Sequence, residues 1–196
     1  MTAAPAAELR ANGGCPPLRL FFALQPDARA RRLLAELARD VANATGGRAP
    51  GAGNLHVTLA FLGDVAPARV VAVEAIGAMA ASAVAPFLLT LDRVGYFRNA
   101  GVAWAGTGAV PPGLQRLFDV LRDALQAARL PVERRAFHPH VTLARRCTRV
   151  LPEAPIAQST HIVWRADALT LMASDTLPGG SRYRQLAVWP LPGGQQ

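Results

Sequence analysis

The chain has 196 residues, 51% of them apolar and 17% charged, which is enough for one sizeable core and too apolar for a protein that stays unfolded. All 21 basic residues are arginine, and a chain without lysine cannot be a lysyl-nucleotide ligase, a Schiff-base enzyme or a P-loop protein. With only 13 acidic residues the net charge is +8, which suits a polyanionic partner such as nucleic acid but also an ordinary solvated surface.

No stretch of the chain reaches the roughly 18 consecutive apolar residues of a membrane-spanning helix, so we expect no membrane partner. The first residues also lack the basic and then apolar pattern of a secretory signal, which favours a cytoplasmic protein. The two cysteines, Cys15 and Cys147, form no paired motif, and we expect reduced thiols rather than a disulfide or a zinc site.

Expected strands and helices alternate along the chain between two irregular ends. Residues 1–17 are expected to form a disordered tail and residues 193–196 a frayed end, which leaves a single domain over 18–192. The hydrophobic periodicity predicts strands over 18–24, 55–62, 87–94, 101–106, 137–144, 162–164, 169–173 and 183–189, and helices over 27–43, 67–83 and 112–129. Because the second half loosely repeats the first, the pattern predicts an α+β fold with two lobes of largely antiparallel sheet.

The tetrapeptide His-Val-Thr-Leu occurs twice, at His56–Leu59 and at His140–Leu143, each within an expected strand. Side chains alternate between the two faces of a strand, so the histidine and the threonine of each copy share one face. His138 lies on the same face as His140, and we expect it to be a supporting residue. The opposite, apolar face is expected to hold Leu55, Val57, Leu59 and Phe61 in the first strand, and Phe137, Pro139, Val141 and Leu143 in the second.

Two imidazoles that face each other form an acid–base pair. With an ordinary pKa of about 6.5, one ring can be neutral and accept a proton from water while the other is charged and donates one to a leaving oxygen. The hydroxyls of Thr58 and Thr142 could donate hydrogen bonds to phosphate oxygens. Paired histidines can also hold a metal ion, but neither motif has a nearby carboxylate or cysteine as a third ligand, so we expect neither a metal nor a cofactor.

The segments Arg19–Leu24, Asn54–Gly63, Val102–Gly106, Pro139–Arg145 and Gly179–Tyr183 resemble the two-histidine phosphoesterase superfamily, and most closely the RNA 2′,3′-cyclic phosphodiesterases, also called 2′-5′ RNA ligases. The resemblance implies a bilobal, pseudo-two-fold fold in which two largely antiparallel sheets line a central groove and helices lie outside. It also implies metal-independent hydrolysis of a 2′,3′-cyclic phosphate to a 2′-phosphomonoester. His56 would then donate a proton to the departing 3′ oxygen and His140 would accept one from water, while Thr58 and Thr142 bind the phosphate.

The resemblance further implies a phosphate contact for Arg145, three positions after the second threonine. Strict alternation instead places Arg145 on the apolar face, away from His140, unless the strand ends or twists at Ala144. Together with Arg146 and Arg149, it could also form a basic loop that steers RNA.

The expected partners are RNA ends that carry a 2′,3′-cyclic phosphate, or small cyclic nucleotides, acted on by a monomer. Tyr96 and Phe97 could stack a base, although aromatic residues in such places more often anchor a loop. Two other functions stay open: a non-catalytic module that binds RNA or nucleotides, and the reverse reaction, which joins RNA ends through a 2′-5′ linkage.

Overall fold

The structure, a computed structural model, describes residues 16–133, 136–157, 160–177 and 180–193. Most of the tail expected over 1–17 and most of the expected end over 193–196 lie outside these ranges. None of the described helices has the length and apolar character needed to cross a membrane. The elements in chain order are β1 (Leu18–Leu24), α1 (Ala28–Thr45), η2 (Ala52–Asn54), β2 (Val57–Val65), η3 (Pro67–Arg69), α2 (Val70–Ser82), β3 (Phe87–Leu91), β4 (Arg93–Phe97), η4 (Arg98–Ala100), β5 (Val102–Gly106), α3 (Pro112–Ala127), β6 (His140–Ala144), β7 (Ala154–Pro155), β8 (Ile162–Ala166), β9 (Ala168–Leu177) and β10 (Gly180–Pro190).

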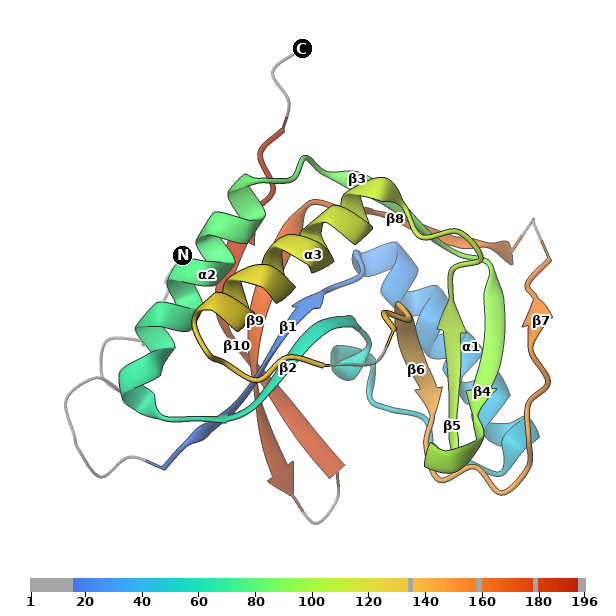
Figure 1. Cartoon of the computed structure of the whole chain (residues 1–196). Coiled ribbons are helices and arrows are strands. Elements are labelled where there is room, and N and C mark those ends of the chain that lie inside the picture. Colours follow the sequence, from blue (N-terminus) through green and yellow to red (C-terminus); the bar gives the residue numbers. More distant parts are fainter. Residues whose placement is uncertain (1–15, 134–135, 158–159, 178–179, 194–196) are drawn as a thin grey trace.

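Eight of the strands form one antiparallel sheet with the order β10-β9-β1-β2-β6-β5-β4-β7, and β3 pairs with β8 in a small second sheet (Figure 1). The large sheet consists of two four-stranded halves that meet where Val57 of β2 pairs with Val141 of β6. The predicted α+β class is confirmed. The two sheets expected from the sequence correspond to these halves, which the β2–β6 pair joins into one sheet.

Several expected strands have different bounds in the structure. The segment expected as one strand over 87–94 divides at Asp92 into β3, which pairs with β8, and β4, which pairs with β5. The strand expected over 137–144 begins only at His140, because Pro139 has no N–H to give to a neighbouring strand. His56 likewise directly precedes β2, so each histidine lies at the start of its strand.

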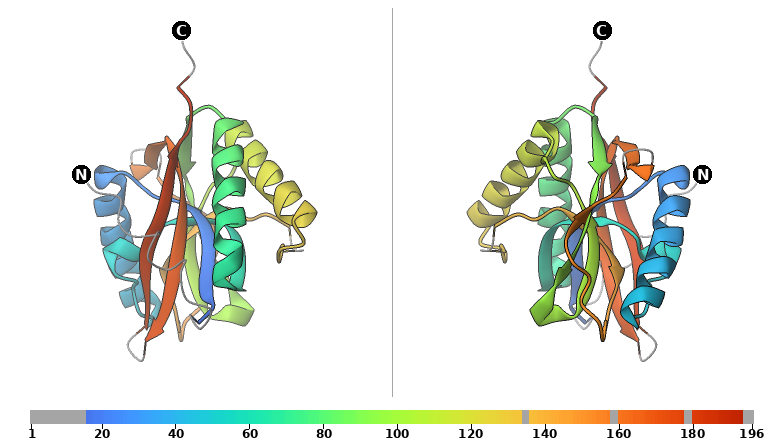
Figure 2. Two further views of the ribbon diagram at one scale, coloured as in Figure 1. Left: turned by 90° about the vertical axis from the view of Figure 1, so that its left-hand side faces the viewer. Right: turned by 90° about the vertical axis from the view of Figure 1, so that its right-hand side faces the viewer.

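Helices cover the sheet from both sides, with α1 on one side of the strands and α2 and α3 on the other (Figure 2). α1 begins where the Asp27 side chain accepts a hydrogen bond from the backbone N–H of Ala30, at 2.7 Å. It ends at Gly46, whose left-handed backbone closes the last turn. Each half of the sheet therefore has one face against helices, and the other face can carry polar side chains.

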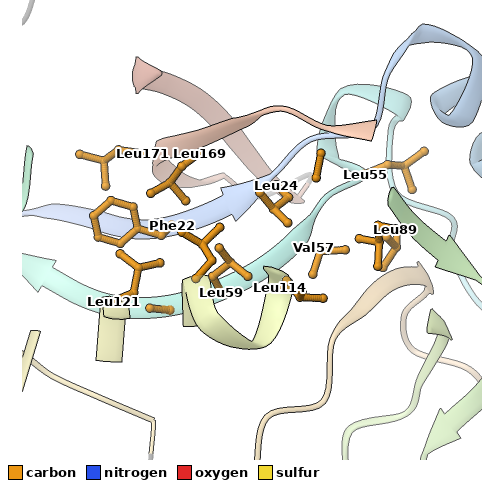
Figure 3. Packing of buried hydrophobic residues seen from close by; sticks show 14 of the residues in the cluster. Phe22, Leu24, Leu55, Val57, Leu59, Leu89, Leu114, Leu121, Leu169 and Leu171 are labelled. Carbon is orange, nitrogen blue, oxygen red and sulfur yellow. The ribbon is translucent and has the colours of Figure 1, made fainter. Parts of the chain in front are cut away.

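Alternation along β1 produces these two faces. Leu20, Phe22 and Leu24 belong to the main core, which Figure 3 shows together with leucines of β2, β9 and α3. Phe21 and Ala23 point the opposite way and form a second, small buried cluster with Met172, against which Tyr183 packs. The face opposite the main core is thus partly aromatic.

A β-bulge follows the threonine of each motif. Thr58 and Ala60 of β2 face consecutive residues of β1, so Leu59 between them is an extra residue. Thr142 and Ala144 of β6 face consecutive residues of β5, so Leu143 is the extra residue there. The two bulges occupy the same position in the two copies of the motif.

The bulges correct the expectation of strict alternation. An extra residue reverses which side chains face the core beyond it, and accordingly both Leu59 and Ala60 are buried. Phe61 was expected on the core face, and this prediction was wrong: its ring packs against Phe21 at 5.3 Å and 48% of the residue is exposed.

Candidate active site

The pairing of β2 with β6 brings the two motifs together at the centre of the large sheet. Val57 lies opposite Val141 in an antiparallel register, so one residue further in each direction His56 lies across from Thr142 and Thr58 across from His140. Side chains directly opposite each other in such a pair have Cβ atoms about 4.5–5.5 Å apart. Both valines are fully buried, so the two histidines and two threonines share the other face.

The two imidazoles are held in the same way. The Nδ1–H of His56 donates to the backbone carbonyl of Asn54, and that of His140 donates to the carbonyl of His138, each at 2.7 Å. Because a carbonyl only accepts, these bonds place the proton of each neutral ring on Nδ1 and leave Nε2 to exchange protons. The Nε2 atom of His56 lies 3.0 Å from the Thr58 hydroxyl. His138, expected as a supporting residue, thus supports His140 through its backbone carbonyl, and Asn54 holds the equivalent position beside His56, a role that the sequence did not indicate.

Burial lowers the pKa of both rings. The pKa of His56 falls to about 4, chiefly through burial and further through the positive charges of Arg145 and His140, while the Asn54 carbonyl opposes the shift. The pKa of His140 is also lowered, again chiefly by burial and further by the positive charges of His138 and Arg145, while the hydrogen bond to the His138 carbonyl opposes the shift. Both rings are therefore neutral at pH 7 in the free protein, which differs from the expectation of one neutral and one charged ring.

Aromatic side chains flank both histidines. Phe21 and Tyr183 lie against His56, with ring centroids 5.0 and 5.3 Å away. Phe97 lies edge-on to His140 at 4.9 Å, and the ring of His138 packs edge-on to Trp104 at 4.5 Å. These contacts orient the imidazoles and exclude water from their flanks.

Arg145 lies on the histidine face. Its Nη2 atom donates to the Thr142 hydroxyl at 3.4 Å, and its charge acts on both imidazoles. The alternation rule would have turned it away, but the bulge at Leu143 reverses the parity of the strand. Its backbone is fixed by a two-hydrogen-bond bridge to Arg48, at 2.8 and 3.0 Å, a residue that the sequence analysis did not single out.

Three loops are tied together beside the site and carry a cluster of arginines. The backbone N–H groups of Thr148 and Arg149 donate to the carbonyl of Thr45, and that of Cys147 donates to Gly101. No described acidic side chain forms an ion pair with any of the arginines in these loops. The arginine cluster consists of Arg48, Arg98, Arg145, Arg146 and Arg149.

Two further residues, Tyr96 and His161, have contacts outside the two motifs. The hydroxyl of Tyr96 donates to the carbonyl of Cys147 at 3.4 Å, which favours the loop-anchoring role for this residue. His161 contacts the carbonyl of Ile156 at 3.0 Å and has no contact with either motif among the interactions of the described residues. Within the described ranges, no group of three His, Cys, Asp or Glu side chains is arranged to hold a metal ion.

Comparison with known proteins identifies the family. The sequence profile described as "2′-5′ RNA ligase superfamily" matches residues 24–177. The chain is 33% identical to the RNA 2′,3′-cyclic phosphodiesterase of Escherichia coli (strain K12), with 89% of this chain and 97% of that protein covered. It is 30% identical to the protein of the same name from Thermus thermophilus, with 90% and 91% covered.

Solved structures agree with the sequence comparison. The crystal structure of E. coli LigT complexed with 3′-AMP is similar to this chain with a TM-score of 0.80 and 32% identity, and the match covers 89% of this chain and 98% of that one. The crystal structure of TT0787 of Thermus thermophilus matches with a TM-score of 0.76 and 30% identity over 90% of this chain and the whole of that one. The chain therefore belongs to the 2′-5′ RNA ligase superfamily.

Proposed function

We propose that this protein hydrolyses 2′,3′-cyclic phosphates to 2′-phosphomonoesters, with His56 and His140 as the proton-transferring pair. The observation that carries the proposal is the β2–β6 register, which sets each histidine across from the threonine of the other motif. Relatives named RNA 2′,3′-cyclic phosphodiesterase, similar over nearly their whole length, support the reaction class.

In this mechanism a water molecule attacks phosphorus and the bond from phosphorus to the 3′ oxygen breaks. His140 accepts the proton of the attacking water at Nε2, and His56 gives the departing 3′ oxygen a proton from its own Nε2. The hydroxyls of Thr58 and Thr142, together with the Arg145 guanidinium, donate hydrogen bonds to the phosphate oxygens as negative charge builds up. No other group has to supply or remove a proton.

His56 has to take up its proton from the solvent when the substrate binds, because burial keeps this ring neutral in the free protein at pH 7. A bound phosphate diester carries a negative charge, and an opposite charge within about 4–6 Å raises the pKa of an imidazole. The substrate therefore creates the charged donor that its own cleavage requires.

The proposed substrates are RNA ends with a 2′,3′-cyclic phosphate and small cyclic nucleotides. The arginine cluster beside the site supports RNA, since guanidinium groups that have no acidic partner among the described residues can bind the phosphates that precede the reacting end. All the proposed site residues come from one chain, so a monomer suffices. A cytoplasmic location stays a prediction from the sequence.

The test compares the wild type with His56→Ala and His140→Ala on adenosine 2′,3′-cyclic phosphate. We expect wild type to release adenosine 2′-monophosphate in the presence of EDTA, and each variant to lose at least about 100-fold in kcat, the range for one acid–base group. His161→Ala, outside the site, is the matched control. Wild-type turnover by either site variant, or release of the 3′ isomer, would contradict the proposal.

The assignment of donor and acceptor needs its own substrate. In a cyclic ester with sulfur in place of the 3′ oxygen, the leaving group is a thiolate, which departs without being protonated. This substrate should therefore restore activity to the variant that lacks the proton donor. We expect a much larger recovery with His56→Ala than with His140→Ala. The opposite result would exchange the two roles while leaving the reaction in place.

Joining of RNA ends through a 2′-5′ linkage is the second candidate, favoured by the name of the superfamily. A 5′ hydroxyl group would then replace water as the nucleophile and lose its proton to His140, while His56 would again protonate the departing 3′ oxygen. Incubation with paired RNA halves shows whether joined product forms. Binding of adenosine 2′-monophosphate without any turnover would instead point to the non-catalytic binding module.

A further inference from the structure

An exposed phenylalanine lies on the same face of the sheet as the two histidines. Phe61 stands three positions after Thr58, and 48% of the residue is exposed. We propose that Phe61 is the stacking platform for the nucleobase of the terminal nucleoside, so that the base lies over β2 while its cyclic phosphate lies between His56 and His140. This inference rests on the proposed function and names how its substrate is held.

Ring contacts connect Phe61 directly to the reacting end of the site. The ring of Phe21 lies between two others, 5.0 Å from His56 and 5.3 Å from Phe61 between centroids, and is itself fully buried. Tyr183 closes the edge of this group, 5.0 Å from Phe21 and 5.3 Å from His56. The exposed ring thus lies one aromatic residue away from the proposed proton donor.

The two halves of the site differ at this position. The motifs continue as Leu59-Ala60-Phe61 and Leu143-Ala144-Arg145, and the equivalent bulges turn both final residues to the histidine face. One half therefore presents an aromatic ring and the other a guanidinium that contacts Thr142. Since a nucleotide is itself a flat base joined to an anion, this asymmetry fixes its direction, with the base toward Phe61 and the phosphate toward Arg145.

Other aromatic residues near the site are already engaged. Phe97 lies among Trp104, His138 and His140 at centroid distances of 4.9 to 5.5 Å. Tyr96 uses its hydroxyl to hold the loop at Cys147. Among the described aromatic residues, Phe61 has the largest exposed fraction.

The experiment compares Phe61→Leu with wild type on two substrates, adenosine 2′,3′-cyclic phosphate and 1-O-methylribose 2,3-cyclic phosphate, which lacks a base. Leucine still covers Phe21 but has no π face, so the preference for the base-bearing ester, measured as the ratio of kcat/KM values, should fall about tenfold. Phe61→Trp should keep or increase this preference. Leu88→Ala, at an exposed apolar residue of β3, is the control and should leave the ratio unchanged.

Binding provides a readout that does not depend on turnover. By calorimetry, we expect Phe61→Leu to weaken adenosine 2′-monophosphate about tenfold relative to inorganic phosphate. Equal losses for both ligands, or for both esters, would show that Phe61 only supports Phe21 and His56, and would overturn the stacking proposal. A wild type that binds the nucleotide with this preference but hydrolyses neither ester would overturn the proposed function and keep the base site.

Discussion

At the scale of single residues, the burial of His56 and His140 sets the pH at which the proposed mechanism operates. The reacting complex carries one proton on the pair, and kcat/KM varies with pH as the singly protonated fraction of the free enzyme. Below about pH 4 both rings are charged, and above the lowered pKa of His140 neither is. We therefore expect a bell-shaped profile of kcat/KM against pH with its maximum below pH 6.5, the ordinary value for histidine.

Arg145→Gln is the internal check on this profile. The guanidinium lowers the pKa of both rings, so its removal should raise both values and move the maximum to higher pH, in addition to lowering the rate. A flat wild-type profile between pH 5 and 9, or a maximum above pH 7, would exclude the buried pair as the titrating groups.

The sequence predicted that the two His-Thr pairs share one face, but not the charge states of the two histidines. The repeated His-x-Thr pattern placed both pairs on one face, and the β2–β6 register brings them together. The lowered pKa of His56 depends on burial against Phe21 and Tyr183, which come from β1 and β10. Contacts between strands so distant in the chain leave no local pattern.

At the scale of elements, the bulges explain where prediction from the sequence succeeded and where it failed. The predicted alternation of side chains between the two faces was correct from His56 to Leu59, because one hydrophobic face is enough to fix the register. The prediction failed at Phe61 and Arg145, because an extra residue between apolar neighbours cannot be told from a regular strand in the sequence. Burial of two consecutive residues, Leu143 and Ala144, is its structural signature.

The loop that supports Arg145 requires a glycine beside it. A Cβ at Gly47 would lie 2.8 Å from the Cys147 Sγ atom and 3.1 Å from the backbone oxygen of Arg145. Gly47→Ala should therefore destabilise the protein by about 1–3 kcal/mol and displace the guanidinium, with a lower melting temperature and a higher KM for a cyclic nucleotide.

Gly51→Ala provides the matched control, because a Cβ there meets no atom within 4 Å. It should melt at the wild-type temperature with the wild-type KM. If Gly47→Ala behaved like this control, the packing of the loop would not determine the position of Arg145.

At the scale of the whole molecule, the strand order is symmetric about β2 and β6, whereas the surface chemistry is not. Aromatic rings surround His56 in one half, and the arginine cluster adjoins the other half through Arg145. The sequence could indicate this cluster only in part, because Arg48 and Arg98 are far from the second motif in the sequence and loop contacts bring their segments beside it. This asymmetry predicts that an RNA strand is held at its end by the site and along its backbone by the cluster.

This arrangement predicts how salt affects the reaction. Each phosphate contact on a single strand adds about 0.7 to the slope of log affinity against log salt concentration. The triple variant Arg98→Gln, Arg146→Gln and Arg149→Gln should therefore reduce that slope by about 2 for a ten-nucleotide RNA with a 2′,3′-cyclic end, and raise its KM more than that of a cyclic mononucleotide.

A control triple at exposed arginines elsewhere, Arg29→Gln, Arg32→Gln and Arg165→Gln, removes the same net charge. Equal slopes for the two triple variants would mean that overall charge, rather than the cluster beside the site, attracts the RNA. A smaller slope for the cluster variant alone would locate the RNA backbone along the loops at Gly101 and Thr148.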